Sequence, residues 1–146
     1  MNIEQANSLL EDQGASCLIF KDQQLIYSSK SIGVKPLIQF INDNPAIKNV
    51  DKLTLVDKVI GKAAMLLAAY IGVSEVFTPV MSQEAIRVAE LYNINYSALK
   101  MVPFIKNRQG NGKCPLELSV ENTEDLQKAL INIRQAITEL MKNKQN

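Results

Sequence analysis

The segment "AAMLLAAYI", residues 63–71, constrains the fold more than any other part of the chain because it is apolar on every side. Helical spacing leaves no polar stripe that could face water, so this helix has to be buried, and it is too short to span a bilayer. It lies between two strand-like runs, "KLTLV" (52–56) and "SEVFT" (74–78). A buried helix between two strands is typical of a parallel sheet covered by helices.

The remaining strand patterns extend this unit in both directions. Strands are predicted at 16–21, 24–28, 52–56, 74–78 and 94–99, with the run 102–105 as a continuation of the last. Only Asp22 and Gln23 separate the first two strands, which favours an antiparallel hairpin. Cys17 and Ile19 point to one side of the first strand, and both sides of it are apolar, as in a strand covered on both faces.

Helices are predicted between these strands and at both ends. Their ranges are 3–12, 36–44, 57–72, 83–92 and 123–141, with a short helix after Cys114 and a frayed tail at 142–146. Asp57 and Ser82 are predicted to cap the helices that follow them. We therefore expect one α/β domain over residues 1–146, a three-layer α-β-α sandwich with a mixed five-stranded sheet and an N-terminal antiparallel hairpin.

Composition excludes several classes of function. Lys and Arg number 16 against 15 Asp and Glu, and no stretch interleaves basic and aromatic residues, so nucleic acid is not expected as a partner. The chain has no histidine, which removes the usual catalytic triads and the imidazole zinc ligand. The opening "MNIEQANSLLEDQ" lacks the features of a secretory signal, so we expect a cytoplasmic protein without a membrane segment and with free thiols at Cys17 and Cys114.

The carboxyl ends of the predicted parallel strands carry the first candidate site residues. In such sheets ligands bind there, where helix N-termini direct free amides toward them. These ends carry Asp57, Lys58, Lys62 and Ser82, and Lys58 and Lys62 are predicted to share one helical face. Lys62 on an apolar helix is either a functional amine or a lysine whose ammonium reaches solvent from an interface. Lys35 either adds charge to this rim or marks a helix start.

The segment "NRQGNGKCPLE", residues 107–117, holds the remaining candidates. It does not fit a P-loop, because Asn107 stands at the first glycine's place and Cys114 at the hydroxyl's. Asn111 and Gly112 predict a tight turn with positive φ values. Asn107, Arg108 and Lys113 are interpreted as binding an anionic ligand, with solvated turn charges as the alternative.

Cys114 has two interpretations. It is either a weak cap of the short helix, with Glu117 completing a capping box, or a nucleophile made acidic by the helix N-terminus and Lys113. The nucleophile hypothesis predicts that Cys114 reacts with iodoacetamide far faster than Cys17, which is interpreted as a core residue.

Four stretches, "ASCLIFKD", "GVKP", "DKVIGKAA" and "NRQGNGKCPLEL", resemble a small prokaryotic family of domains of unknown function assigned to the cytidine-deaminase-like fold. The resemblance covers about residues 3–135. Zinc deaminases carry His-x-Glu or Cys-x-Glu and Pro-Cys-x-x-Cys at two helix starts. The corresponding places here hold "IGK" (60–62) and "MSQEA" (81–85), so the resemblance implies this fold without zinc, and neither a metal nor a cofactor is expected.

Three functional hypotheses follow. The first is a zinc-free module that binds a small anionic or nucleotide-like ligand at the strand ends, with Lys62, Ser82 and Cys114 bordering one common hollow. The second is an enzyme that uses Cys114 as nucleophile or Lys62 as amine or general base. The third is a structural homo-oligomer that packs through the apolar helix 63–71.

Overall fold

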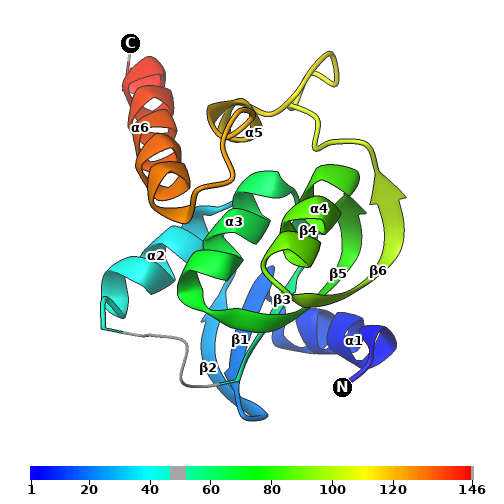
Figure 1. The fold of residues 1–146 in the computed structure, drawn as a ribbon. Helices are drawn as coiled ribbons and strands as arrows, with labels where there is room; N and C mark the ends of the chain where they lie inside the picture. The colour runs from blue at the N-terminus through cyan, green and yellow to red at the C-terminus, as the bar shows by residue number, and fades with distance from the viewer. Residues whose placement is uncertain (47–51, 146) are drawn as a thin grey trace.

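The computed structural model describes residues 1–46 and 52–145, which form one mixed six-stranded sheet and six helices (Figure 1). The α/β class predicted from the sequence is confirmed. The strands are β1 (Cys17–Lys21), β2 (Gln24–Ser29), β3 (Leu53–Asp57), β4 (Val59–Ile60), β5 (Val73–Ser82) and β6 (Asn95–Val102). The helices are α1 (Ile3–Gln13), α2 (Lys35–Asp43), α3 (Lys62–Ile71), α4 (Gln83–Leu91), α5 (Pro115–Ser119) and α6 (Leu126–Gln145).

The sheet combines an antiparallel hairpin with parallel strands. β1 pairs antiparallel with β2 and with β3, whereas β3, β4 and β6 are all parallel to β5. β6 pairs along most of one edge of β5. The opposite edge of β5 pairs first with β3 and then with β4. The hairpin turn contains no glycine, yet Asp22 and Gln23 adopt positive φ values of 48° and 75°. The antiparallel pairing of β1 with β2 confirms the predicted hairpin.

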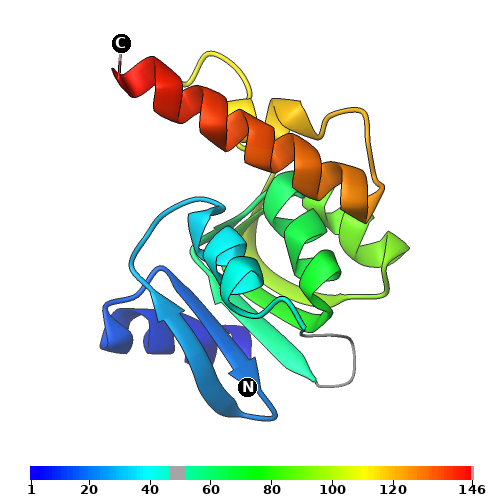
Figure 2. The same cartoon turned by 90° about the vertical axis from the view of Figure 1, so that its left-hand side faces the viewer.

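The two faces of the sheet are covered by different helices. α1 packs Ala6 and Leu10 on one face against Leu18, Phe20 and Phe77. The other face carries the larger core, built from α2, α3 and α4, and α6 crosses over α3 (Figure 2). The side chains of β1 alternate between these two cores, as predicted from its double apolar pattern.

α3 forms the centre of the larger core, as its composition predicts. Most of its side chains are buried, including Leu66 and Leu67 at 0% exposure. It ends at Gly72, which has the left-handed φ of 97° that glycine adopts without strain. The helical layer of α2, α3 and α4 is thus centred on a helix that has no polar face.

The start of α3 differs from the prediction. Asp57 is the last residue of β3 and does not cap α3; the two-residue strand β4 intervenes, and the helix begins at Lys62 behind Gly61. The sheet consequently has six strands instead of five. Lys58 is exposed between β3 and β4, so Lys58 and Lys62 do not share a helical face. Ser82 does cap α4, because its Oγ accepts a hydrogen bond from the Ala85 N–H at 3.1 Å.

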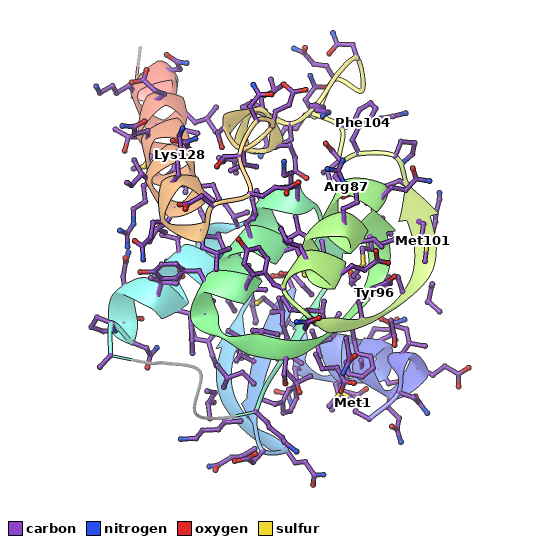
Figure 3. The ribbon with its side chains drawn as sticks, in the orientation of Figure 1. Met1, Arg87, Tyr96, Met101, Phe104 and Lys128 are labelled. Carbon is purple, nitrogen blue, oxygen red and sulfur yellow. The ribbon has the colours of Figure 1, made fainter. Side chains whose placement is uncertain are left out.

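The C-terminal third follows the predicted order with two changes. β6 ends at Val102, before Pro103, so the run 102–105 does not extend it. β6 forms an edge of the sheet, where Met101 points outward (Figure 3). α6 continues to Gln145 and includes most of the tail that was expected to fray. Within the described residues, no helix combines the length and apolarity needed to cross a membrane.

Candidate functional site

The end of the sheet at β3 and β4 opens into two adjoining cavities. The inner chamber has a volume of about 330 Å³ and is lined by Asp57 and Glu117 among others. The basic groove, of about 780 Å³, is bordered by residues 30–35, residues 106–109 and the C-terminal half of α6, which projects past α3 in Figure 2. Both linings contain Ile32, Gly33, Val34, Cys114 and Leu116. The chamber and the groove therefore adjoin along these residues, and the two together are called the cleft below.

The basic groove concentrates positive charge. Its lining contains Lys30, Lys35, Lys106 and Arg108, and no acidic residue belongs to the described lining. The chain as a whole is nearly balanced, with 16 basic and 15 acidic residues, so this grouping is not a consequence of composition. Ile137, Leu140 and Met141 of α6 supply an apolar wall in the same lining. The groove thus offers cationic and apolar surface together.

Two loops carry the cationic residues of the groove, and hydrogen bonds within the protein anchor their backbone. The first loop lies between β2 and α2. Ser16, which precedes β1, donates hydrogen bonds from Oγ to the carbonyl oxygens of Ser29, at 3.1 Å, and of Ser31. This contact anchors the end of β2, from which Lys30 extends. Ser16 itself is only 6% exposed, so the anchor lies within the protein rather than on its surface.

Asn107 organises the second loop. Its Oδ1 accepts a hydrogen bond from the Asn111 N–H at 3.2 Å, and its Nδ2 donates to Asn111 Oδ1 at 2.9 Å. The positive φ of this turn, 74°, falls at Gly110, which corrects the prediction that placed it at Asn111 and Gly112. Asn107 therefore shapes the loop that presents Arg108 to the groove.

Glu117 closes the N-terminus of α3 from 55 residues away along the chain. Its Oε1 accepts from the Lys62 N–H at 2.8 Å, and its Oε2 accepts from the Ala63 N–H at 2.7 Å. The side chain is 4% exposed, and this burial raises the pKa of its carboxyl group. Gly61 makes the approach possible, since a Cβ at that position would lie 1.8 Å from Glu117 Oε1.

The capping predictions made from local spacing are accordingly wrong in two places. Glu117 does not complete a capping box with Cys114, because its carboxylate is committed to α3. Cys114 stands at the N-cap of α5 but makes no side-chain capping hydrogen bond. The carboxylate at the start of α3 belongs to Glu117, in the place where Asp57 was expected.

Asp57 lies on the chamber lining with its carboxyl group almost fully buried, the residue being 5% exposed. Its Oδ2 has no hydrogen-bond partner among the described residues. Burial raises the pKa of this carboxyl group to about 7, although the backbone N–H groups of Val59 and Lys58 and the neighbouring Cys17 thiol oppose the increase. The chamber therefore contains a carboxyl group that titrates near neutral pH.

The two cysteines have different environments. Cys17 is fully buried in the core, as predicted, and burial together with the adjacent Asp57 raises the pKa of its thiol, so that it stays protonated. Cys114 is half-buried where the chamber meets the groove. Its proposed role as nucleophile stays a prediction.

Lys62, Lys113 and Ser82 lie outside this cleft. Lys62 lines a separate polar pocket of about 240 Å³ and donates from Nζ to the Glu121 carbonyl oxygen at 3.2 Å. Figure 3 labels Arg87, which lines the same pocket from α4, and Phe104, whose ring centre is 5.9 Å from Lys113 Nζ.

The prediction of one common hollow for Lys62, Ser82 and Cys114 is therefore wrong. Lys113 Nζ pairs with Glu84 at 3.0 Å and with Glu121 at 3.2 Å, and these contacts raise its pKa. Ser82 is fully buried, with its hydroxyl occupied by the α4 cap. The side chains of Lys62, Lys113 and Ser82 are thus engaged in the protein's own contacts and do not border the cleft.

The residues present do not fit the zinc site of deaminases. Across residues 1–46 and 52–145, no three Cys, Asp or Glu side chains gather in the way a metal ion requires. At the positions that the resemblance aligns with that site, Gly61 makes room for a carboxylate that binds backbone amides, and Ser82 caps a helix.

Comparison with known proteins places the chain in a family. The family model described as a domain of unknown function, DUF1893, matches residues 5–137. The chain belongs to the DUF1893 family. The crystal structure of a DUF1893 family protein from Thermotoga maritima, TM1506, is similar with a TM-score of 0.77 and 24% identity, covering 93% of this chain and 88% of that one. This similarity shows that the two share a fold. A search of curated proteins returned no match.

Proposed function

We propose that this DUF1893 protein is a zinc-free binding module for a small organic anion of nucleotide-like size. The observation that carries the proposal is the grouping of Lys30, Lys35, Lys106 and Arg108 around one groove whose described lining has no acidic residue. Arg and Lys side chains that converge in this way are the usual protein ligands of phosphate and carboxylate groups. The scaffold that we propose is of the cytidine-deaminase type.

The start of α2 supports the same ligand chemistry. α2 has nine residues, and its N-cap, Val34, provides no side-chain hydrogen bond to the first amides. Gly33, Val34 and Lys35 all belong to the groove lining. A helix N-terminus carries partial positive charge, which adds to that of the four cationic side chains.

The volumes of the cleft are consistent with a small organic ligand. Binding sites for such molecules measure roughly 300–1,000 Å³ and are mostly apolar with a few placed polar groups. The groove has about 780 Å³ and combines its cations with Leu116, Ile137, Leu140 and Met141. We assign the anion to the cations of the rim and the body of the ligand to this apolar wall.

The proposal revises the candidate residues. Arg108, with Lys106, Lys30 and Lys35, contacts the anion; Asn107 positions the loop; Asp57, Lys58 and Cys114 border the chamber. Lys62, Ser82 and Lys113 leave the proposed ligand site. No observation favours a reaction in this cleft over binding alone, so the enzymatic roles of Cys114 and Lys62 stay predictions. The cytoplasmic location and the homo-oligomer also stay predictions.

The test is thermal stability in the presence of pyrophosphate, ribose 5-phosphate and nucleoside monophosphates. At one hundred times its dissociation constant, a ligand that binds only the folded state adds about 2.7 kcal/mol to the free energy of unfolding. We expect at least one of these anions to stabilise the wild-type protein. The variants Lys106→Glu and Arg108→Glu should each weaken binding about tenfold or more, since each replaces an attractive charge by a repulsive one.

The matched control is Lys128→Glu, which makes the same change of charge at an exposed position of α6 outside the groove lining (Figure 3). This variant should retain most of the wild-type affinity. Equal losses in all three variants would show that only net charge matters. No stabilisation by any of the anions would reject the proposal.

A further inference from the structure

The two parts of the cleft differ in the charged side chains that line them. The groove presents only donors among its charged side chains, namely the ammonium and guanidinium groups of Lys30, Lys35, Lys106 and Arg108. The buried charged groups of the chamber lining are the carboxyl groups of Asp57 and Glu117, and the lining also contains the exposed Lys58. A molecule that extends from the groove into the adjoining chamber therefore meets cationic donors at one end and buried carboxyl groups at the other.

Of these two carboxyl groups, only Asp57 has an oxygen that accepts no hydrogen bond from the described residues. Both oxygens of Glu117 already accept backbone hydrogen bonds, from Lys62 and Ala63. Asp57 Oδ2, in contrast, has no partner among the described residues, although the residue is 5% exposed. A buried oxygen without a partner is costly, so a ligand that supplies a donor there removes a penalty as well as forming a contact.

The wall around Asp57 restricts where such a donor can come from. Val34, Ala63, Ala64, Ile105 and Leu116 line the chamber with apolar side chains. These residues offer no side-chain donor to the carboxylate, and they favour a flat or compact apolar body between the two polar ends of the ligand. A ligand carbonyl facing the ionised Asp57 carboxylate would instead place two acceptors against each other.

We propose that the ligand is an organic phosphate or carboxylate that carries an N–H donor at the end opposite its anion, and that this N–H group binds Asp57 in the inner chamber. The inference rests on the proposed function, because it assumes that the anion occupies the basic groove. It adds the chemistry of the other end of the molecule. An amine or an amino-substituted aromatic ring meets this description.

Two matched pairs of probes test the proposal by titration calorimetry. 4-Aminophenyl phosphate is compared with 4-methylphenyl phosphate, and 4-aminobenzyl phosphate with 4-methylbenzyl phosphate, so that each pair exchanges an amino group for a methyl group of similar size. We expect the amino probe of at least one pair to bind the wild-type protein about tenfold more tightly than its methyl partner, as a hydrogen bond to a charged group would give. In Asp57→Asn the preference should fall to less than threefold, because an uncharged amide replaces the carboxylate.

The outcomes separate the two proposals. If no probe binds the wild-type protein, the anion site itself is rejected. If the phosphates bind but neither amino probe is preferred, the anion site stands and the N–H donor is rejected. A preference that survives in Asp57→Asn would assign the donor to another acceptor and overturn the role of Asp57. The wild-type comparison decides the question even if the variant does not fold.

Discussion

Glu117→Ala should lower the free energy of unfolding by about 3 kcal/mol or more, measured by urea denaturation at pH 7. The substitution removes two hydrogen bonds from a carboxylate to the Lys62 and Ala63 N–H groups, at 2.8 and 2.7 Å. Hydrogen bonds to charged groups are worth about 1.5–3 kcal/mol each, and the amides left behind are buried at the start of the central helix. Glu117→Gln retains one good acceptor and should cost about half as much.

Gly61→Ala tests the same contact from the opposite side. The added Cβ would lie 1.8 Å from Glu117 Oε1 and 2.6 Å from Ile105 Cγ1, so the carboxylate would have to move off the helix. Gly112→Ala is the matched control, because its Cβ would find its nearest neighbour at 3.9 Å. Gly61→Ala should destabilise strongly in the wild-type background and less in Glu117→Ala. Equal costs for the two glycine variants, or a Glu117→Ala protein as stable as the wild type, would contradict this role.

Asp57→Asn should make the protein less sensitive to pH, with the largest gain in relative stability above neutrality. The pKa of the Asp57 carboxyl group is raised from 3.8 to about 7 in the folded protein, so between about pH 4 and 7 the folded state holds a proton that the unfolded chain releases. Stability is therefore lost as pH rises through this window. A shift of about three pKa units corresponds to a loss on the order of 4 kcal/mol by pH 8.

Urea denaturation at several pH values between 4 and 8 measures this effect. The difference in free energy of unfolding between Asp57→Asn and the wild type should change in favour of the variant by several kcal/mol across the range. Asp12→Asn removes an exposed carboxyl from α1, and the difference between the two variants reports the buried site. A difference that does not change with pH would show that Asp57 is already ionised at low pH, held so by Lys58 and the backbone amides beside it.

Local sequence patterns predicted the order of elements and the apolar faces because both depend on neighbours along the chain. The stripe of Leu37, Phe40 and Ile41 is buried as predicted, and so is the all-apolar α3. β4 was missed because a strand of two residues, Val59–Ile60, has no periodicity, and its apolar residues extend the helical pattern that follows them.

The candidate site was less predictable because it is assembled from distant segments. Lys30 and Lys35 lie 71 to 78 residues from Lys106 and Arg108 in the sequence, and only the folded chain places them on one groove. Lys30 and Lys106 carried no local signal and were missed. The role of Glu117 was read as local for the same reason, since spacing within "CPLE" cannot reveal that Gly61 leaves room for its carboxylate.

Backbone amide shifts in ¹⁵N NMR during a pyrophosphate titration locate the bound anion directly. We predict that the largest shifts fall on residues 30–35 and 106–109, the two loops of the basic groove. The polar pocket offers its own cations, Lys62 and Arg87, beside residues 121–124. Shifts centred on that pocket, or no shifts at millimolar pyrophosphate, would contradict a ligand site in the cleft.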